Sequence, residues 1–444
     1  MKKYFMFAAV AGMLASCSSE SLTGSDPKIE PTQEERVPIL LSVSSPSIDV
    51  ARGTTRGTGT VGGVGTGANQ WYGQRIKAFM FKEGSLTPAL EDATDPTSFF
   101  YKDLEMITPG TAENLITPAP DATSGEAMIS DGTIKYYPAS GNFDFFGYHG
   151  DNAITGSLNE SADPWTVPFT IDGSQDLMST KAEPTTAEIT SLGSRAADFY
   201  SAYAARKNVH PTLKFNHLLT RLSFVIKAGD DSAAGWNGTA QVAGNAVNVN
   251  SIQVESKTTG DMAVAWTTTP TNMITWGAAT AYLPLKERPY AYENANPTNL
   301  ISKAAYDALP AGTPGQDDYT KTGGNTNFNL IALTPAYPTV TPAAGSYTAD
   351  ETPIGEALIV APSTTDYNMK VNVSQLVPQN WTGTPAPAVK YQDYDLVIPA
   401  PTGGFLPNTS YKVVLTVYGF ERIVVKTEIT PWTLDPTSIN VGQD

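Results

Sequence analysis

Short runs of alternating apolar residues, each ended within a few positions by turn-forming residues, constrain the fold of this chain most strongly. The 444 residues include 37 glycines and 33 prolines, spread over the whole length. Because proline removes a backbone donor and glycine weakens a helix interior, a long helical bundle is excluded. Apolar residues that alternate with a period of two indicate short strands. The sequence therefore predicts an all-β protein with few short helices.

The clearest strand pair lies near the C-terminus. Alternate positions from 411 to 417 are apolar, and residues 418–421 follow as a turn. A second strand begins at Arg422 and carries an apolar run at 423–425. This order predicts a β-hairpin with a short connection. Residues 142–148 carry aromatic side chains on both faces, so both faces should be covered. Further strands are expected at 75–82, 213–226 and 262–266. Many short strands in two halves predict two immunoglobulin-like β-sandwich domains in tandem.

Two local irregularities interrupt these patterns. The alternation from Val247 to Val254 changes phase after Val249, as one extra residue in a β-bulge would cause. Residues 188–206 have a wider apolar spacing and form the best helix candidate, although Gly193 weakens it. We expect this helix to lie beside a sheet.

Charge and ligand content exclude several classes of function. The 28 basic and 44 acidic residues give a net charge of −16, which repels a phosphate backbone, so no nucleic-acid partner is expected. The three histidines and the single cysteine offer no metal-ligand spacing and no internal disulfide. We therefore expect no metal-binding and no cofactor-binding residues.

Catalytic constellations are also absent from the sequence. His217 lies among apolar strand residues, which favours a structural role over that of a general base. The acidic pairs at 230–231 and 317–318 lie in turn-rich sequence and not in the arrangement of a glycosidase. No Gly-x-Ser-x-Gly motif is present. We expect no catalytic residues and a protein that is not an enzyme.

The N-terminus has the pattern of a secretion signal. Lys2 and Lys3 precede an apolar run from Tyr4 to Leu14 that is too short for a permanent membrane span. The small residues before the lone Cys17 resemble a bacterial lipobox. That resemblance implies cleavage before Cys17 and attachment of lipid, palmitate included, which would hold the protein on a membrane. Residues 18–35 are polar and should form a flexible tether.

A single predicted strand follows the tether. Val37, Ile39, Leu41 and Val43 alternate and should share one face. The glycine-rich stretch from 44 to 67 comes next and should be exposed and flexible, and it contains two Arg-Gly bonds, after Arg52 and after Arg56.

Besides the lipobox, the chain contains a series of motifs at residues 37–43, 55–59, 134–138, 141–149, 174–178, 217–222 and 418–422. Together these motifs resemble the fimbrillin family of Bacteroidales, the lipoprotein precursors of type V pilus subunits. The resemblance covers nearly the whole chain, and it rests on the order and spacing of the motifs. It implies two transthyretin-like β-sandwich domains and a structural subunit of adhesive fimbriae. It also implies an outer-membrane precursor that becomes part of an extracellular fimbrium.

The family resemblance further implies a route of assembly. A trypsin-like protease cuts after an arginine, removes the lipidated N-terminal strand, and leaves a groove for the C-terminal strand of another pilin subunit, either a second copy or a homologue. Arg56 is the first candidate for the cleavage site and Arg52 the second. Arg36 fits poorly, because cleavage there would leave the strand attached. The removable strand would carry Val37, Ile39, Leu41 and Val43.

The implied donor strand lies between Arg422 and Val441. Ile439 and Val441 are its expected anchors if only the tail exchanges. Pro431 and Pro436 each remove a ladder donor, so pairing there must be interrupted or confined to an edge.

The domain organisation predicted from these features has five parts. They are a signal peptide (1–16), a tether (17–36), the removable strand with its cleavage segment (37–56), an N-terminal sandwich (57–212) and a C-terminal sandwich with the donor tail (213–444). The alternative is a surface glycan-binding lipoprotein of a polysaccharide-uptake system. It would keep Cys17 on the mature protein and bind polysaccharide through exposed tryptophans such as Trp236 or Trp381.

Overall fold

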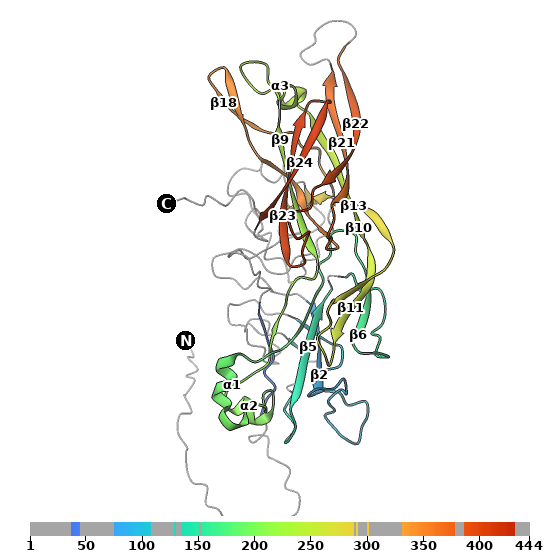
Figure 1. Ribbon diagram of the computed structural model, residues 1–444, viewed down its shortest axis with the longest axis vertical. Helices are drawn as coiled ribbons and strands as arrows, with labels where there is room; N and C mark the ends of the chain where they lie inside the picture. Colours follow the sequence, from blue (N-terminus) through green and yellow to red (C-terminus); the bar gives the residue numbers. More distant parts are fainter. Residues whose placement is uncertain are drawn as a thin grey trace, which may run out of the picture. The chain divides into compact units, whose positions relative to one another are not determined.

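The computed structural model describes most of the chain as β-strands. The described residues are 37–44, 75–107, 128–129, 135–150, 152–287, 290–291, 300–301, 331–377 and 386–430. Figure 1 shows strands that follow one another along the chain and only a few short helices. The predicted all-β fold with few short helices is confirmed.

The first half contains a five-stranded antiparallel sheet. Its order is β4 (Met128–Ile129), β3 (Leu104–Ile107), β2 (Arg75–Lys82), β5 (Phe143–His149) and β7 (Met178–Lys181). Every residue of β5 is buried, because one face of the sheet packs into a core that contains Phe145 and the opposite face into a core that contains Phe146. The aromatic residues on both faces of this strand are therefore covered, as predicted.

A three-stranded sheet covers one of these faces. Its order is β12 (Ile274–Trp276), β11 (Thr259–Ala265) and β6 (Trp165–Thr170). The core between the two sheets is rich in aromatic rings, and Phe81 meets Trp165 edge to face at 5.0 Å between ring centroids. Since β11 follows residue 213 and β6 precedes it, strands from both predicted domains share this sheet. The boundary at 212 and 213 stays a prediction.

Two four-stranded sheets form a sandwich in the second half. One has the order β13 (Thr280–Pro284), β10 (Asn248–Lys257), β21 (Tyr367–Val377) and β22 (Ala388–Ile398). The other has the order β20 (Thr352–Val360), β9 (Thr220–Ala228), β23 (Thr409–Tyr418) and β24 (Arg422–Thr430). Alternate residues from both sheets fill the core between them, for example Phe224, Ile226, Val371 and Val413.

Two local predictions in this sandwich are confirmed. The hairpin joins β23 to β24, with Tyr418 opposite Arg422. The register of β10 against β21 shifts between Val249 and Ser251, where the change of phase predicted a bulge.

The predicted helix at 188–206 is divided into three pieces. They are α1 (Thr186–Leu192), the 3-10 turn η2 (Gly193–Arg195) and α2 (Ala202–Arg206). The capping box of Thr185 and Glu188 starts α1, and Gly193, whose φ is +59°, ends it. We name residues 186–206 the helical excursion. It lies between β7 and β8 (Thr212–Lys214) in the chain.

The long strand expected at 213–226 is divided into β8 and β9. The residues between these two strands pass from one core to another. Phe215 is buried in the core that contains Phe145, and Leu219 is buried in the core that contains Phe146. The remaining elements are short. They are β1 (Ser42–Ser44), α3 (Asp231–Ala234), η3 (Ala243–Asn245), β14 (Lys286–Glu287), β15 (Tyr290–Ala291), β16 (Leu300–Ile301), β17 (Ile331–Ala332), β18 (Val340–Ala343) and β19 (Ser346–Ala349).

Candidate functional site: the buried N-terminal strand

Residues 37–44, which we name the N-terminal strand, are part of the protein core although they precede the first long strand of the fold. Ile39, Leu41 and Val43 are each at most 1% exposed, and Val37 packs against the same core. The four side chains that were expected to share a face therefore do so. The neighbouring Leu40 is only partly buried.

The N-terminal strand pairs with two separate segments of the chain. Its first part is antiparallel to residues 135–137: the amide of Tyr137 donates to the carbonyl of Val37, and that of Ile39 to the carbonyl of Lys135, both at 2.9 Å. Its second part, β1, runs parallel to β8 with Ser42 opposite Thr212. We name the space between these two partners the strand groove.

Pro38 lies at a position of the strand groove where the backbone ladder needs no amide hydrogen from the N-terminal strand. It forms the bridge with Tyr136, but the hydrogen bonds on either side of the bridge use the amides of Ile39 and Tyr137. Proline at such a position removes no ladder hydrogen bond.

A pair of hydroxyl groups connects the strand to β8. The Oγ of Ser42 lies 2.7 Å from the Oγ1 of Thr212, and Ser42 is only 6% exposed. The amide of Ser42 also donates to the carbonyl of Pro211 at 2.9 Å. Because a buried hydroxyl needs a hydrogen-bond partner, Ser42 depends on Thr212, whose own side chain is only partly buried.

The core beneath the strand, which we name the strand core, draws on elements from much of the first half. It includes Ile76 and Met80 of β2, Phe143 and Phe145 of β5, Tyr137, Tyr200, Leu213 and Phe215. Burial of Ile39, Leu41 and Val43 contributes about 1.5–3 kcal/mol for each side chain as an upper bound. Loss of the strand would expose these partners to water.

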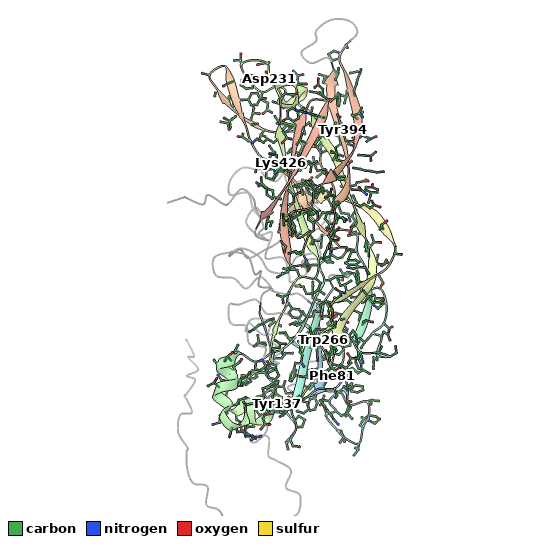
Figure 2. All side chains as sticks on the ribbon, viewed as in Figure 1. Phe81, Tyr137, Asp231, Trp266, Tyr394 and Lys426 are labelled. Carbon is green, nitrogen blue, oxygen red and sulfur yellow. The ribbon has the colours of Figure 1, made fainter. Side chains whose placement is uncertain are left out.

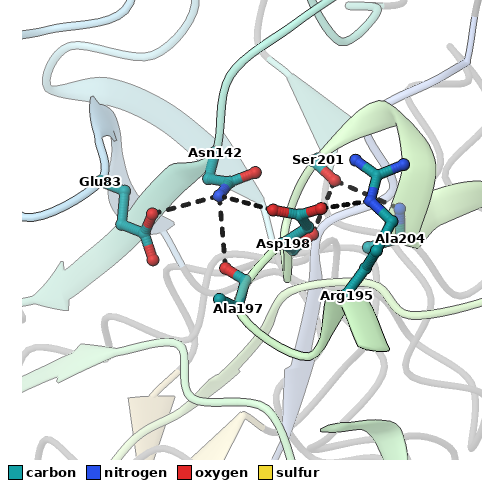
Figure 3. Close-up of polar contacts among 7 residues, drawn as sticks. All are labelled: Glu83, Asn142, Arg195, Ala197, Asp198, Ser201 and Ala204. Carbon is teal, nitrogen blue, oxygen red and sulfur yellow. Dashed lines mark hydrogen bonds and ion pairs between the residues drawn. The ribbon is translucent and has the colours of Figure 1, made fainter. Parts of the chain in front are cut away.

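The helical excursion is attached to the sheet beside the strand core by a polar cluster (Figure 3). The side-chain Nδ2 of Asn142 donates to Glu83 at 3.2 Å, to the carbonyl of Ala197 at 3.3 Å and to Asp198 at 3.4 Å. Arg195 donates to the other carboxylate oxygen of Asp198. These contacts hold the loop before α2, and α2 leads directly to β8.

The carboxyl group of Asp198 responds electrostatically to this cluster. Hydrogen bonds from Arg195 and Asn142 lower the pKa of Asp198 below its ordinary value. The hydrogen bonds from Arg195 and Asn142 thus favour the charged form of the Asp198 carboxyl group.

The strand core contains one buried hydroxyl that lacks a hydrogen bond within the described part of the chain, that of Tyr137. Burial raises the pKa of Tyr137 well above its ordinary value, and the neighbouring Tyr101 and Tyr200 add to this. The side chains of the N-terminal strand that enter this core are Ile39, Leu41 and Val43, so they offer no side-chain partner to the hydroxyl.

The predicted structural role of His217 agrees with its position. Its main chain forms a bridge with Met178, and the amide of Leu218 donates to the carbonyl of Leu177 at 2.9 Å. Two sequence motifs, 174–178 and 217–222, are thereby brought together. The sequence pattern did not identify Asp176 as the partner of His217, nor Thr212 as that of Ser42, because both contacts join segments far apart in the chain.

Five predicted site residues lie outside the described residues: Cys17, Arg52, Arg56, Ile439 and Val441. In sequence, the two Arg-Gly bonds fall between the end of β1 at Ser44 and the start of β2 at Arg75.

The tryptophan proposed for glycan binding is not exposed. Trp236 is 7% exposed, and its ring centroid lies 5.2 Å from that of Tyr347, in the core of the second sandwich. The expectation of an exposed Trp236 was wrong because its side chain belongs to the same core as Ala233 and Ala234 of α3. Trp381 lies outside the described residues.

Within the described ranges, no group of three or more His, Cys, Asp or Glu side chains is arranged to hold a metal ion. The same ranges contain no helix that is long and apolar enough to cross a membrane. Figure 2 shows the side chains of these ranges; the labelled Phe81, Tyr137 and Trp266 belong to the two cores of the first half.

No protein-family model and no curated protein matches the chain. Several solved structures are similar to it. One, described as a candidate cell adhesion protein from Bacteroides uniformis, is 14% identical; the match covers 91% of this chain and 100% of that one, with a TM-score of 0.40. Another of the same description, from Bacteroides ovatus, is 13% identical, with coverages of 90% and 99% and a TM-score of 0.41.

The fimbrial anchor protein Mfa2 from Porphyromonas gingivalis is also similar. It is 9% identical, the match covers 89% of this chain and 97% of that one, and the TM-score is 0.28. These three solved structures are described as cell adhesion and fimbrial proteins.

Proposed function

We propose that this protein is a non-enzymatic structural subunit of adhesive cell-surface fimbriae. The observation that carries the proposal is the burial of Ile39, Leu41 and Val43 in a strand that precedes two Arg-Gly bonds. Cleavage after Arg56, or after Arg52, separates this strand from the rest of the fold without cutting β2 or any later strand.

Loss of the strand creates a site for another strand. Residues 135–137 and β8 would each lose a backbone partner, and the strand core would lose three buried side chains. An extended segment from another subunit restores both the ladder hydrogen bonds and the buried apolar surface. The C-terminal tail with Ile439 and Val441 supplies that segment, so subunits join end to end.

The N-terminal residues fit a membrane-bound precursor. A lipid on Cys17 holds the protein at the outer membrane before cleavage, and the polar tether separates the lipid from the N-terminal strand. Removal of residues up to Arg56 releases the subunit for assembly into an extracellular fimbrium.

The test is the N-terminal residue of the protein in two fractions, measured by intact mass and peptide mapping. Protein from sheared cell-surface material should begin at Gly57 or Gly53 and occur in high-mass polymers, whereas the membrane fraction should retain lipidated Cys17. A lipidated Cys17 on every recovered molecule, with no polymer, would overturn the proposal and favour a surface lipoprotein that binds glycans.

A further inference from the structure

We propose that tail residues 436–441 of a second copy occupy the strand groove in one defined register and direction, and that Thr212 selects this register. The inference rests on the proposed function, because it describes the occupant of the same groove after strand removal. The sites that residues 38–43 fill set the requirements for the occupant.

The tail matches the N-terminal strand position by position when both are read in the same direction. Each tail residue takes the place of the residue 398 positions earlier: Pro436 that of Pro38, Thr437 of Ile39, Ile439 of Leu41, Asn440 of Ser42 and Val441 of Val43. Two aliphatic side chains then enter two fully buried sites. A polar side chain meets Thr212, and a proline again lies beside Tyr136.

A shift of the tail by two residues in either direction fails. One shift brings Asp435 to the site of Ile39, where a carboxylate would be buried without a charge partner from the strand. The opposite shift brings Gln443 to the site of Val43, which is 0% exposed, and Gly442 to the site of Ser42. Both shifts bury polar groups in an apolar core.

The reverse direction fits the side chains but not the backbone. Val441, Ile439 and Thr437 could then fill the three buried sites, with Ser438 beside Thr212. Pro436 would fall at Ser44, which pairs with Lys214 in the β1–β8 ladder. Proline is disfavoured at a paired ladder position, whereas the position of Pro38 already accepts one.

Thr212 distinguishes residues at the position of Ser42. In the resident strand its hydroxyl lies 2.7 Å from that of Ser42, and the amide of Asn440 can both donate to and accept from such a hydroxyl. Since Thr212 is only partly buried, an apolar residue there would forgo this hydrogen bond and leave the Thr212 hydroxyl to water. Thr437 also brings a hydroxyl into the strand core, where that of Tyr137 lacks a hydrogen bond from the described residues.

Disulfide trapping tests the register and direction together. Full-length protein with Cys17→Ser and Thr212→Cys is cleaved after Arg56 and incubated under mild oxidation with synthetic peptides of residues 431–444 that carry either Asn440→Cys or Ser438→Cys. The Asn440→Cys peptide should cross-link at least about tenfold more than the other, detected by intact mass. As a control, Ser42→Cys with Thr212→Cys in uncleaved protein should close an internal disulfide.

Each remaining outcome contradicts a specific claim. Preferential cross-linking of the Ser438→Cys peptide would show the reverse direction and overturn the inference. Binding of the unmodified peptide without any cross-link at Thr212 would overturn the register while the proposed strand exchange stands. Failure of every peptide to bind cleaved protein would overturn the proposed function itself.

A second measurement tests the role of Thr212 directly. Cleaved protein should bind the unmodified peptide about fivefold more tightly than an Asn440→Val peptide, which corresponds to one hydrogen bond of typical strength. The isosteric variant Thr212→Val should lose this preference. An equal preference in both proteins would show that Thr212 does not select the residue at this position.

Discussion

The Nδ1 atom of His217 lies 2.5 Å from the Oδ2 atom of Asp176, and both side chains are completely buried. Asp176 precedes β7, and His217 lies in the segment between β8 and β9. The pair therefore connects the sheet of the first half to the segment that enters the second half.

Replacement of Asp176 by Ala should lower the free energy of unfolding by about 3–5 kcal/mol, because it leaves the buried His217 ring without its carboxylate partner. Urea unfolding, followed by tryptophan fluorescence, measures the change. The exposed Asp395→Ala is the matched control and should change stability by less than about 0.5 kcal/mol. Similar small effects from both variants would show that the pair contributes little.

Leu41→Ala should destabilise the uncleaved protein by about 2–5 kcal/mol, since Leu41 is 1% exposed and its removal leaves a cavity in the strand core. Leu40→Ala removes the same atoms from the adjacent, partly buried position and should cost clearly less. Chemical unfolding compares the two variants. Equal losses of free energy of unfolding would contradict the packing of the N-terminal strand by alternate faces.

Arg56→Ala should move the processed N-terminus from Gly57 to Gly53, because the second Arg-Gly bond remains available to a trypsin-like protease. The double variant with Arg52→Ala should accumulate as uncleaved precursor without polymers. Arg36→Ala serves as the control and should leave processing unchanged. Intact mass of membrane and sheared fractions gives the answer, and normal polymers from the double variant would contradict cleavage in this segment.

Tyr137→Phe should raise the free energy of unfolding by about 1–2 kcal/mol, because it removes a buried hydroxyl that has no hydrogen bond from the described residues. An unchanged or lower stability would indicate that the hydroxyl has a partner in the protein.

The same substitution should alter the response to alkali. The folded-state pKa of Tyr137 is raised above 10.0, so above that pH the unfolded chain loses the phenolic proton first. Below the unfolded pKa, ionisation of Tyr137 does not reduce the free energy of unfolding. From that pKa upward, the free energy of unfolding declines as pH rises toward the folded pKa. Tyr137→Phe should make the alkaline decline shallower in unfolding curves measured from pH 8 to pH 11. If stability declines as steeply in Tyr137→Phe as in the unsubstituted protein, the alkaline decline arises from other tyrosines.

Local sequence patterns determined much of the secondary structure. The alternation in β2 and β23, the hairpin into β24 and the bulge after Val249 all follow from a period of two residues and from turn-forming residues. The burial of Ile39, Leu41 and Val43 follows from the same period. These features depend on residues that are close together in the chain, so short stretches of sequence are enough to predict them.

Tertiary structure alone decided which segments meet. Nothing near Ser42 in the sequence marks Thr212, which is 170 residues away, as the partner of its hydroxyl, and nothing near Trp236 shows that Tyr347 covers its ring. Such contacts arise when the sheets pack, because any strand with an apolar face can pair with many others and only the complete core selects one arrangement. The sequence thus determined that the N-terminal strand has a face to bury, and the fold determined the groove in which that face is buried.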